Sequence, residues 1–203
     1  MQIRKINNYI NGRWREPDGA DYLDVQNPST EQVIAQVPMT GQEETARAIE
    51  AAYTAFPDWK NTAASKRVAY LYSFLDKVIR DEEKISRILV EEMGKSFPDA
   101  RAEMKRAVEN IQAACAMPLL QQGDVMTGCS EGIDGTVLRL PLGVFTLIAP
   151  FNFPAMVPFW FIPYALASGN TYVAKPSELV PLTMEHITRL IDEAGFPPGV
   201  FNL

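Results

Sequence analysis

The chain has 203 residues, 47% of them hydrophobic, which is enough apolar material for one or two folded domains. Its formal net charge is −6 and no basic cluster occurs, so neither nucleic acid nor an anionic membrane is expected as a partner. Two cysteines and a single histidine, His186, exclude a disulfide framework and argue against a metal site or a Ser-His-Asp relay. The opening MQIRKINNYING lacks the apolar run of a signal peptide, which indicates a cytoplasmic protein.

The first forty residues are predicted to form short strands joined by turns. The segment NYINGRW contains Asn11-Gly12, a strong hairpin signal, and VQNPSTEQVIAQVP predicts a second hairpin that turns at Asn27-Pro28.

Four helices are predicted to follow. Thr40 and Glu43 have the spacing of a capping box at the start of the first helix. Gly94 is predicted to end the third helix, and the fourth begins near Pro98. The apolar stripes at helical spacing are Ala46, Ile49, Tyr53 and Phe56; Val68, Leu71, Leu75, Val78 and Ile79; Ile85, Ile88, Leu89 and Met93; and Met104, Val108, Ile111 and Cys115.

The sequence pattern changes twice in the last eighty residues. Glycines and the alternating GTVLRLPLG predict an exposed β-arm over residues 124–142. From Gly143 the pattern is βαβαβ, with strands at GVFTLIA, NTYVAK and GVFNL and a helix from about Pro154 to Ser168. This alternation predicts an α/β fold with an incomplete doubly wound parallel sheet over 143–203, preceded by strands and helices over 1–123.

An uncharged stretch from Leu140 to Ala174 is long enough to cross a membrane. It is interrupted by Asn152 and Asn170 and by prolines that include Pro150, Pro154, Pro158 and Pro163. Lipid offers no water to the backbone groups that prolines leave unpaired, so a buried strand-turn-helix is favoured over a membrane hairpin.

Asn152 lies where the GVFTLIA strand ends, the edge at which doubly wound sheets bind ligands. A rigid side-chain amide there could donate a hydrogen bond to an oxygen that gains negative charge during a reaction. The alternative is a cap for the helix that follows, which residue type alone favours.

Lys175 and Glu178, in AKPSE, follow the next strand of the sheet. An acid at this position suits the diol of a ribose and disfavours a 2′-phosphate, which predicts NAD rather than NADP. The alternative is a solvated turn with ordinary surface charges. The phosphate-binding motif G-x-G-x-x-G does not follow the Gly143 strand.

The remaining candidates are weaker. Cys115 lies on an apolar helix face, and Cys129 lies in a turn-rich region without a neighbouring base. His186 is interpreted as a surface or boundary residue. Arg106 either pairs with Glu103 or Glu109 on the surface or faces a cleft and binds a substrate carboxylate.

Together, the segment APFNFPAMVPFWFIPYALASGNTYVAKPSELVPLT, the opening INGRW and the ending PPGVFNL resemble the aldehyde dehydrogenase superfamily. The resemblance covers essentially the whole chain. Phe151 before the asparagine is typical of the CoA-acylating methylmalonate-semialdehyde dehydrogenases, where most of the superfamily has tryptophan.

The resemblance implies a coenzyme domain, a catalytic domain and a β-arm for homo-oligomerisation. It implies that Asn152 donates to the oxyanion formed when a catalytic cysteine attacks the aldehyde, which reverses the preference for a cap. It further implies coenzyme A as co-substrate, a small aldehyde with a carboxylate as substrate, and Arg106 as the group that binds this carboxylate. The positions implied to bind NAD are Ala149, Phe151, Lys175, Ser177 and Glu178.

Two departures from the family pattern matter. Leu179 stands where this branch commonly has arginine, and family members are more than twice as long, with the nucleophilic cysteine beyond the part that this chain matches. The resemblance therefore implies an amino-terminal portion that is inactive by itself. The competing hypothesis is a non-catalytic module that associates with full-length subunits through its β-arm and its unpaired sheet edge.

Overall fold

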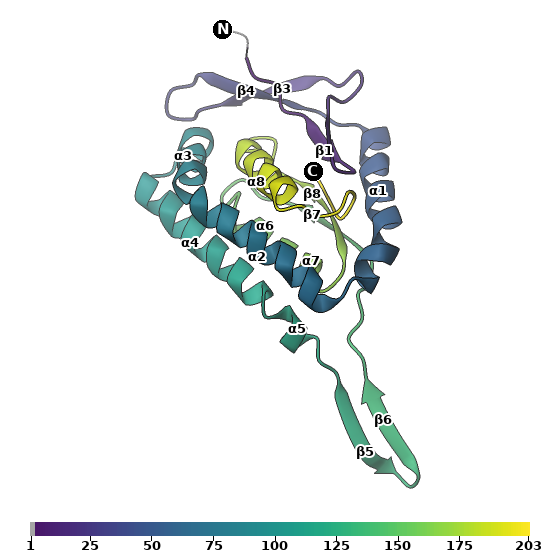
Figure 1. The fold of residues 1–203 in the computed structure, drawn as a ribbon. Helices are drawn as coiled ribbons and strands as arrows, with labels where there is room; N and C mark the ends of the chain where they lie inside the picture. Colours follow the sequence, from purple (N-terminus) through teal and green to yellow (C-terminus); the bar gives the residue numbers. More distant parts are fainter. Residues whose placement is uncertain (1–2) are drawn as a thin grey trace.

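The computed structural model describes residues 3–203, and two antiparallel hairpins open the fold (Figure 1). In the first turn, Asn11 and Gly12 have φ values of 51° and 73°. A two-residue type I′ turn requires positive φ at both positions, which Asn-Gly adopts readily. Both predicted hairpins are therefore confirmed. The strands are β1 (Asn8–Ile10), β2 (Arg13–Arg15), β3 (Tyr22–Gln26) and β4 (Val33–Pro38).

A helical layer follows, with its helices close to the predicted positions. Gly94 ends α3 in the left-handed conformation at φ 78°, as predicted. The side chain of Ser96 accepts a hydrogen bond from the Asp99 backbone N–H and so caps α4. The helices are α1 (Gln42–Asn61), α2 (Ala64–Arg80), α3 (Glu82–Met93), α4 (Phe97–Ala114) and the short α5 (Met117–Leu120).

The predicted capping box of α1 is wrong. Gly41 is the N-cap residue, and no side chain among residues 3–203 caps the helix. The Thr40 hydroxyl instead accepts a hydrogen bond from Asn8 Nδ2 at 3.0 Å, which ties the start of α1 to β1. A tertiary partner therefore replaces the local cap at this position.

The predicted buried face of α1 is also wrong. Ile49 and Tyr53 are 43% and 67% exposed. The small side chains of this helix face the sheet, so its backbone approaches closely enough for Thr171 Oγ1 to donate to the Ala52 carbonyl at 2.8 Å. The residues that α1 buries are Glu44, Ala48, Ala52 and Trp59. In α2 the predicted stripe is buried except for Ile79, which is 48% exposed.

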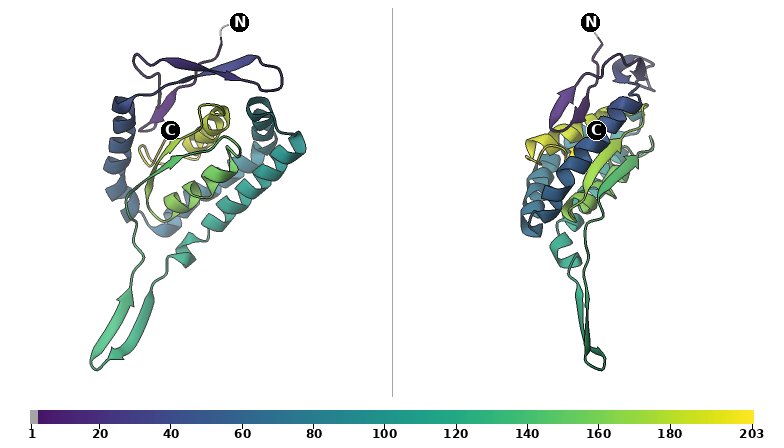
Figure 2. Two further views of the ribbon diagram at one scale, coloured as in Figure 1. Left: turned by 180° about the vertical axis from the view of Figure 1, so that it is seen from behind. Right: turned by 90° about the vertical axis from the view of Figure 1, so that its right-hand side faces the viewer.

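A long hairpin projects from the body of the molecule (Figures 1 and 2). It consists of β5 (Asp124–Ser130) and β6 (Ile133–Val137), which pair antiparallel. Apolar side chains along it, such as Val125 and Ile133, are 73% and 57% exposed. The hairpin corresponds to the predicted β-arm, whereas its role in assembly and the division at residues 124 and 142 stay predictions.

The central sheet is parallel, in the order β7-β8-β9, and this confirms the predicted α/β class. Among residues 3–203, β7 pairs with β8 only, so one of its edges is open. Phe145 and Ile148 on this strand are 37% and 79% exposed. The elements are β7 (Val144–Ile148), β8 (Thr171–Lys175), β9 (Phe201–Asn202) and α8 (Leu182–Glu193), with the predicted helix from Pro154 to Ser168 split into α6 (Met156–Phe159) and α7 (Ile162–Ala167).

Arg67 is a buried cation at the junction of α2 with α7. It is 5% exposed, and its Nε donates to the Ala167 carbonyl at 2.9 Å while Nη2 donates to Gln121 Oε1 at 3.1 Å. Nη1 donates to the carbonyl of Thr62. A buried charge is stable only when it is hydrogen-bonded, and this one side chain links two backbone segments, at Thr62 and Ala167, with the side chain of Gln121.

Within residues 3–203, no helix combines the length and the apolar character that crossing a bilayer requires.

Candidate functional site

The carboxyl ends of β7 and β8 lie side by side. The parallel register pairs Ile148 with Lys175, and the Ala149 N–H donates to the Lys175 carbonyl at 2.9 Å. Ala149 itself is 8% exposed, so its contribution to a ligand site is a backbone one. The register therefore brings the loops that carry Asn152 and Glu178 to the same end of the sheet, where the carboxyl ends of the strands lie.

Asn152 is exposed, and its side chain makes no hydrogen bond within residues 3–203. The proposed alternative, a cap for the following helix, is wrong. The N-terminal amides of α6 are satisfied by Glu103 of α4, whose Oε1 accepts from Ala155 N at 2.9 Å and from Met156 N at 3.1 Å. The Asn152 amide is therefore free to donate to a ligand.

Lys175 and Glu178 form an ion pair at the end of β8, with Nζ 2.8 Å from Oε2. The hydrogen bond from Lys175 holds the pKa of the Glu178 carboxyl below its ordinary value, so the acid is ionised at neutral pH. Ser177, 8% exposed, accepts the Leu179 N–H at 3.3 Å and holds the turn between them. An ammonium donor and a carboxylate acceptor next to each other suit a vicinal diol.

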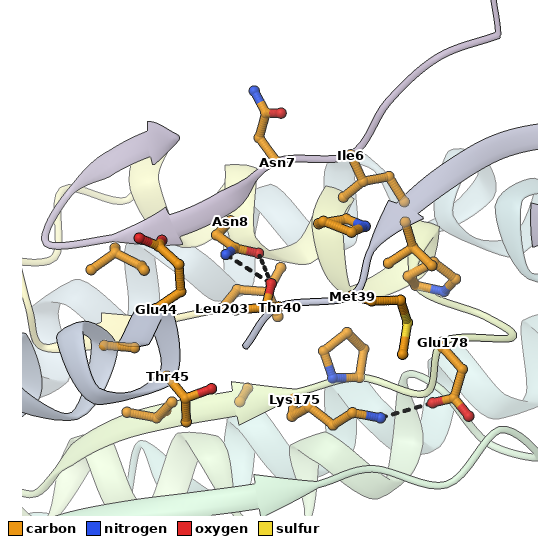
Figure 3. A pocket seen from close by; sticks show the side chains of 18 residues that line it. Ile6, Asn7, Asn8, Met39, Thr40, Glu44, Thr45, Lys175, Glu178 and Leu203 are labelled. Atoms are coloured by element: carbon orange, nitrogen blue, oxygen red, sulfur yellow. Dashed lines mark hydrogen bonds and ion pairs between the residues drawn. The ribbon is translucent and has the colours of Figure 1, made fainter. Parts of the chain in front are cut away.

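A pocket of about 210 Å³ includes this ion pair (Figure 3). Figure 3 shows Lys175 and Glu178 at one end beside Met39, and Glu44 and Thr45 of α1 towards the other end. Sequence reasoning did not predict the contribution of the amino-terminal segment, because no local motif connects it with the sheet. Asn152 and Phe151 lie outside this pocket, and Phe151 is 54% exposed.

Arg106 lies on the surface of α4. Its guanidinium is 3.0 Å from Glu109 Oε2 and its side chain is 70% exposed. Of the two partners weighed from the sequence, Glu109 is therefore the one observed. Glu103 instead pairs with Lys95, and both side chains are buried. The position of Arg106 leaves it able to bind a carboxylate from solvent.

Neither cysteine lies at this site. Burial raises the pKa of the Cys115 thiol on the apolar face of α4. Cys129 lies in the exposed hairpin, where its thiol donates to the Ile133 carbonyl at 3.2 Å. His186 is buried rather than on the surface and lies 2.9 Å from Asp81 Oδ2, while burial lowers its pKa. The two cysteines and the histidine therefore contribute no base or nucleophile to the strand ends.

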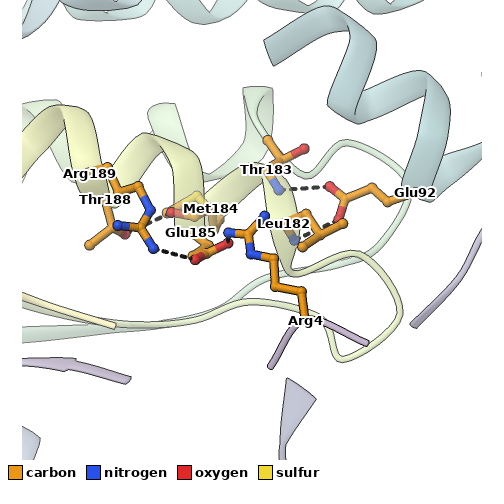
Figure 4. A network of polar contacts seen from close by, with 8 residues as sticks. All are labelled: Arg4, Glu92, Leu182, Thr183, Met184, Glu185, Thr188 and Arg189. Atoms are coloured by element: carbon orange, nitrogen blue, oxygen red, sulfur yellow. Dashed lines mark hydrogen bonds and ion pairs between the residues drawn. The ribbon is translucent and has the colours of Figure 1, made fainter. Parts of the chain in front are cut away.

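Buried acids fix the start of α8, next to the Glu178 loop (Figure 4). Glu92 reaches from α3 and accepts the backbone N–H groups of Leu182 and Thr183 at 2.6 and 2.9 Å. One turn further, Glu185 lies between Arg4 and Arg189. The sequence analysis did not single out Glu92, because its hydrogen-bond partners lie about ninety residues away in the chain.

Glu92 makes stability depend on pH. Burial raises its pKa from an ordinary value of 4.5 to about 7. The folded chain therefore keeps a proton that the unfolded chain releases, and stability falls as pH rises between these two values. We expect the free energy of unfolding to fall by about 2–3 kcal/mol more for the wild type than for Glu92→Gln between pH 5 and pH 8.

Urea unfolding followed by circular dichroism at several pH values measures this difference. Glu91→Gln, an exposed neighbour on the same helix, is the control and should follow the wild type. Equal pH slopes for the wild type and Glu92→Gln would refute the prediction.

Comparison with known proteins identifies the family. The profile of the aldehyde dehydrogenase family matches residues 14–203. The chain belongs to the aldehyde dehydrogenase family. This aldehyde dehydrogenase chain is 42% identical over 203 residues to the malonate-semialdehyde dehydrogenase 1 of Shouchella clausii (strain KSM-K16), all of this chain matching 41% of that protein. The resemblance read from the sequence is therefore confirmed.

Solved structures give the same result for this aldehyde dehydrogenase fold. The methylmalonate-semialdehyde dehydrogenase of Oceanimonas doudoroffii superposes with a TM-score of 0.95 at 37% identity, covering 98% of this chain and 41% of that one. A Sinorhizobium meliloti 1021 structure, described as a methylmalonate-semialdehyde dehydrogenase complexed with NAD, has a TM-score of 0.94 at 30% identity, covering 99% and 41%. The chain thus spans about two fifths of the length of these relatives.

Proposed function

We propose that the chain contributes the coenzyme-binding part and the oxyanion donor of an NAD-dependent aldehyde dehydrogenase. The observation that carries this proposal is the pairing of β7 with β8, which places the free amide of Asn152 and the Lys175–Glu178 ion pair at one edge of the sheet. The family membership supports it. The reaction is the oxidation of a small semialdehyde to an acyl-CoA, with coenzyme A as co-substrate.

The residues at the end of β8 fit the adenosine ribose of NAD. The ionised Glu178 carboxylate would accept hydrogen bonds from the ribose hydroxyls, and Lys175 would donate to the same diol. The backbone at Ala149 and Phe151 and the turn at Ser177 would complete the binding surface. When bound, NAD supplies the acceptor for the hydride that leaves the substrate.

Two side chains are assigned to the aldehyde substrate, one on the loop after β7 and one on α4. Asn152 would donate a hydrogen bond from its amide to the substrate oxygen as negative charge develops there. Arg106 would bind the carboxylate of malonate or methylmalonate semialdehyde, because its guanidinium is exposed and its ion pair with Glu109 lies on the surface. The β5–β6 hairpin, with its exposed apolar side chains, would pair with other subunits in a homo-oligomer.

A second candidate is a non-catalytic module that associates with longer subunits. The exposed Ile148 on the open edge of β7 and the projecting hairpin favour it. The two candidates differ in one measurable respect, since only the first requires Asn152 and Glu178 to act on substrate and coenzyme.

A hybrid enzyme tests the proposal. In the hybrid enzyme, residues 1–203 of this chain replace the matching 41% of the Shouchella clausii malonate-semialdehyde dehydrogenase. We expect the hybrid to form NADH from malonate semialdehyde, NAD and coenzyme A, and the 203-residue chain alone to form none, because it brings no cysteine to the strand ends. Aldehyde-dependent NADH formation by the chain alone would refute this division of roles.

Glu178 is expected to select NAD over NADP. In the hybrid enzyme, Glu178→Gln should raise the ratio of kcat/KM for NADP to that for NAD by about tenfold, because the variant removes the charge that repels a 2′-phosphate. Initial rates with each coenzyme measure the ratio. The control is Glu131→Gln in the hairpin turn, which keeps the net charge equal to that of the first variant. An unchanged ratio in Glu178→Gln would contradict ribose binding at this residue.

A further inference from the structure

The loop that carries Asn152 is held mainly by hydrogen bonds to other elements. It runs from Ala149, after β7, to Ala155, before α6. At its start the Ala149 N–H is bound by the Lys175 carbonyl at 2.9 Å. The Asn152 side chain makes no hydrogen bond within residues 3–203. An oxyanion donor has to be held in place before the reaction, so the anchor must come from other elements.

An ion pair whose side chains are almost fully covered contacts this loop. Lys95 follows the left-handed Gly94 that ends α3, and its ammonium pairs with Glu103 of α4. The side chains are 9% and 1% exposed, respectively. Two charges are rarely buried to this degree unless each makes further hydrogen bonds.

Lys95 makes its further contacts with the Asn152 peptide. Its Nζ donates to the Asn152 carbonyl at 3.2 Å and lies 4.7 Å from the centroid of the Phe153 ring. These contacts fix the peptide plane on the carboxyl side of Asn152. The side-chain amide of Asn152 is left unoccupied.

Glu103 makes its further contacts with the end of the same loop. Its Oε1 accepts the N–H groups of Ala155 and Met156 at 2.9 and 3.1 Å, while Oε2 pairs with Lys95. A carboxylate that accepts several hydrogen bonds is a strong, directional anchor. The Asn152 carbonyl and the end of the loop are therefore both bound by one charged pair from α3 and α4.

We propose that Lys95 and Glu103 are positioning residues that hold the Asn152 amide in its orientation towards the substrate oxygen. This role rests on the function proposed above for Asn152. The pair acts through the backbone of residues 152–156 and through the Phe153 ring.

Nuclear magnetic resonance of the 203-residue chain tests the positioning without any turnover. In Lys95→Met we expect amide exchange at Ala155 and Met156 to accelerate at least about tenfold, because the anchor loses its counter-charge. The side-chain amide resonances of Asn152 should shift as well. Glu103→Gln should show the same changes, and Lys95→Arg should restore the wild-type pattern by returning the charge.

The control is Glu109→Gln, an exposed acid on the same helix, which should change none of these signals. Exchange at Ile187 in α8 reports on global unfolding and should stay constant. The proposal is wrong if both variants leave the Ala155 amide protected, or if exchange at Ala155 and Ile187 accelerates equally. In the wild type, backbone motion at Asn152 as fast as that in the hairpin turn would also overturn it, and this needs no variant to fold.

Kinetics of the hybrid enzyme separate positioning from the proposed function. Lys95→Met should lower kcat by a larger factor than it raises KM for NAD, because the side chains proposed to bind the ribose lie at the end of β8 and only the backbone contacts at Ala149 and Phe151 share the loop. If amide exchange at Ala155 accelerates but kcat of an active hybrid stays constant, the proposed catalytic role of Asn152 is wrong. The proposed positioning role of Lys95 and Glu103 is then wrong as well. If the loop does not loosen, the positioning itself is wrong.

Discussion

In the hybrid enzyme, Asn152→Ala is expected to lower kcat by about 10²- to 10³-fold, the typical loss when one oxyanion donor is removed. The KM for NAD should stay within about twofold, because the groups proposed to bind the ribose lie at the end of β8. The loss of rate has an electrostatic cause, because a water molecule stabilises the negative charge on the substrate oxygen less well than a fixed amide donor does. Single-turnover measurement of NADH formation gives this rate without interference from product release.

Two further substitutions make the Asn152 experiment specific. Asn152→Asp keeps the shape but removes both donors, so it should be as damaging as alanine. Asn61→Ala, at the exposed end of α1, should leave kcat unchanged. A fully active Asn152→Ala hybrid would remove Asn152 from the mechanism.

Arg67→Met is expected to destabilise the chain by about 3 kcal/mol or more. The variant keeps the apolar stem but leaves the carbonyls of Thr62 and Ala167 and the Gln121 amide oxygen without their donor. The Ala167 carbonyl is buried and the other two acceptors are partly buried, and a buried acceptor without a partner costs about 1–3 kcal/mol. The urea midpoint of unfolding, followed by circular dichroism, measures the loss.

The matched control for Arg67 is Arg87→Met. Arg87 pairs with Glu83 on the surface of α3, with both side chains 69% exposed. Such a pair contributes under about 1 kcal/mol, so this variant should unfold almost like the wild type. Equal midpoints for the two variants would show that burial of the Arg67 charge does not determine the stability of the α2–α7 junction.

The parts of the fold that the sequence predicted are those with local causes. Asn and Gly adopt positive φ more readily than other residues, and Asn11 and Gly12 form their turn in this conformation. Gly94 ends α3 with a positive φ as well. The alternation of apolar strands and helices after Gly143 predicted the parallel sheet, because each βαβ unit has to cover its own sheet face. The strand ends followed from this topology, and with them Asn152 and Glu178.

The parts that sequence reasoning missed depend on distant segments. The face of α1 was predicted from its largest apolar residues, whereas close approach to β8 selects small ones such as Ala52. Glu103 reads as a surface charge until α3, α4 and the β7 loop meet around it. A signal was present, since Glu103 falls between Ala100 and Ala107 on the buried face of α4, but the backbone N–H groups that it binds are more than fifty residues away.

The open edge of β7 connects these observations with the length of the chain. Ile148 on that strand is 79% exposed, and the chain spans about two fifths of its relatives. An open edge strand of a doubly wound sheet can pair with further strands. The hybrid enzyme supplies such strands, which is why the catalytic predictions are made for it.

The most direct test of the central claim is a crystal structure of the hybrid enzyme with NAD. We predict that the adenosine ribose hydroxyls lie about 3 Å from Lys175 Nζ and from a Glu178 carboxylate oxygen. We also predict that the nicotinamide end lies beside the Asn152 amide. NAD bound elsewhere, or with its ribose away from these two side chains, would contradict the account.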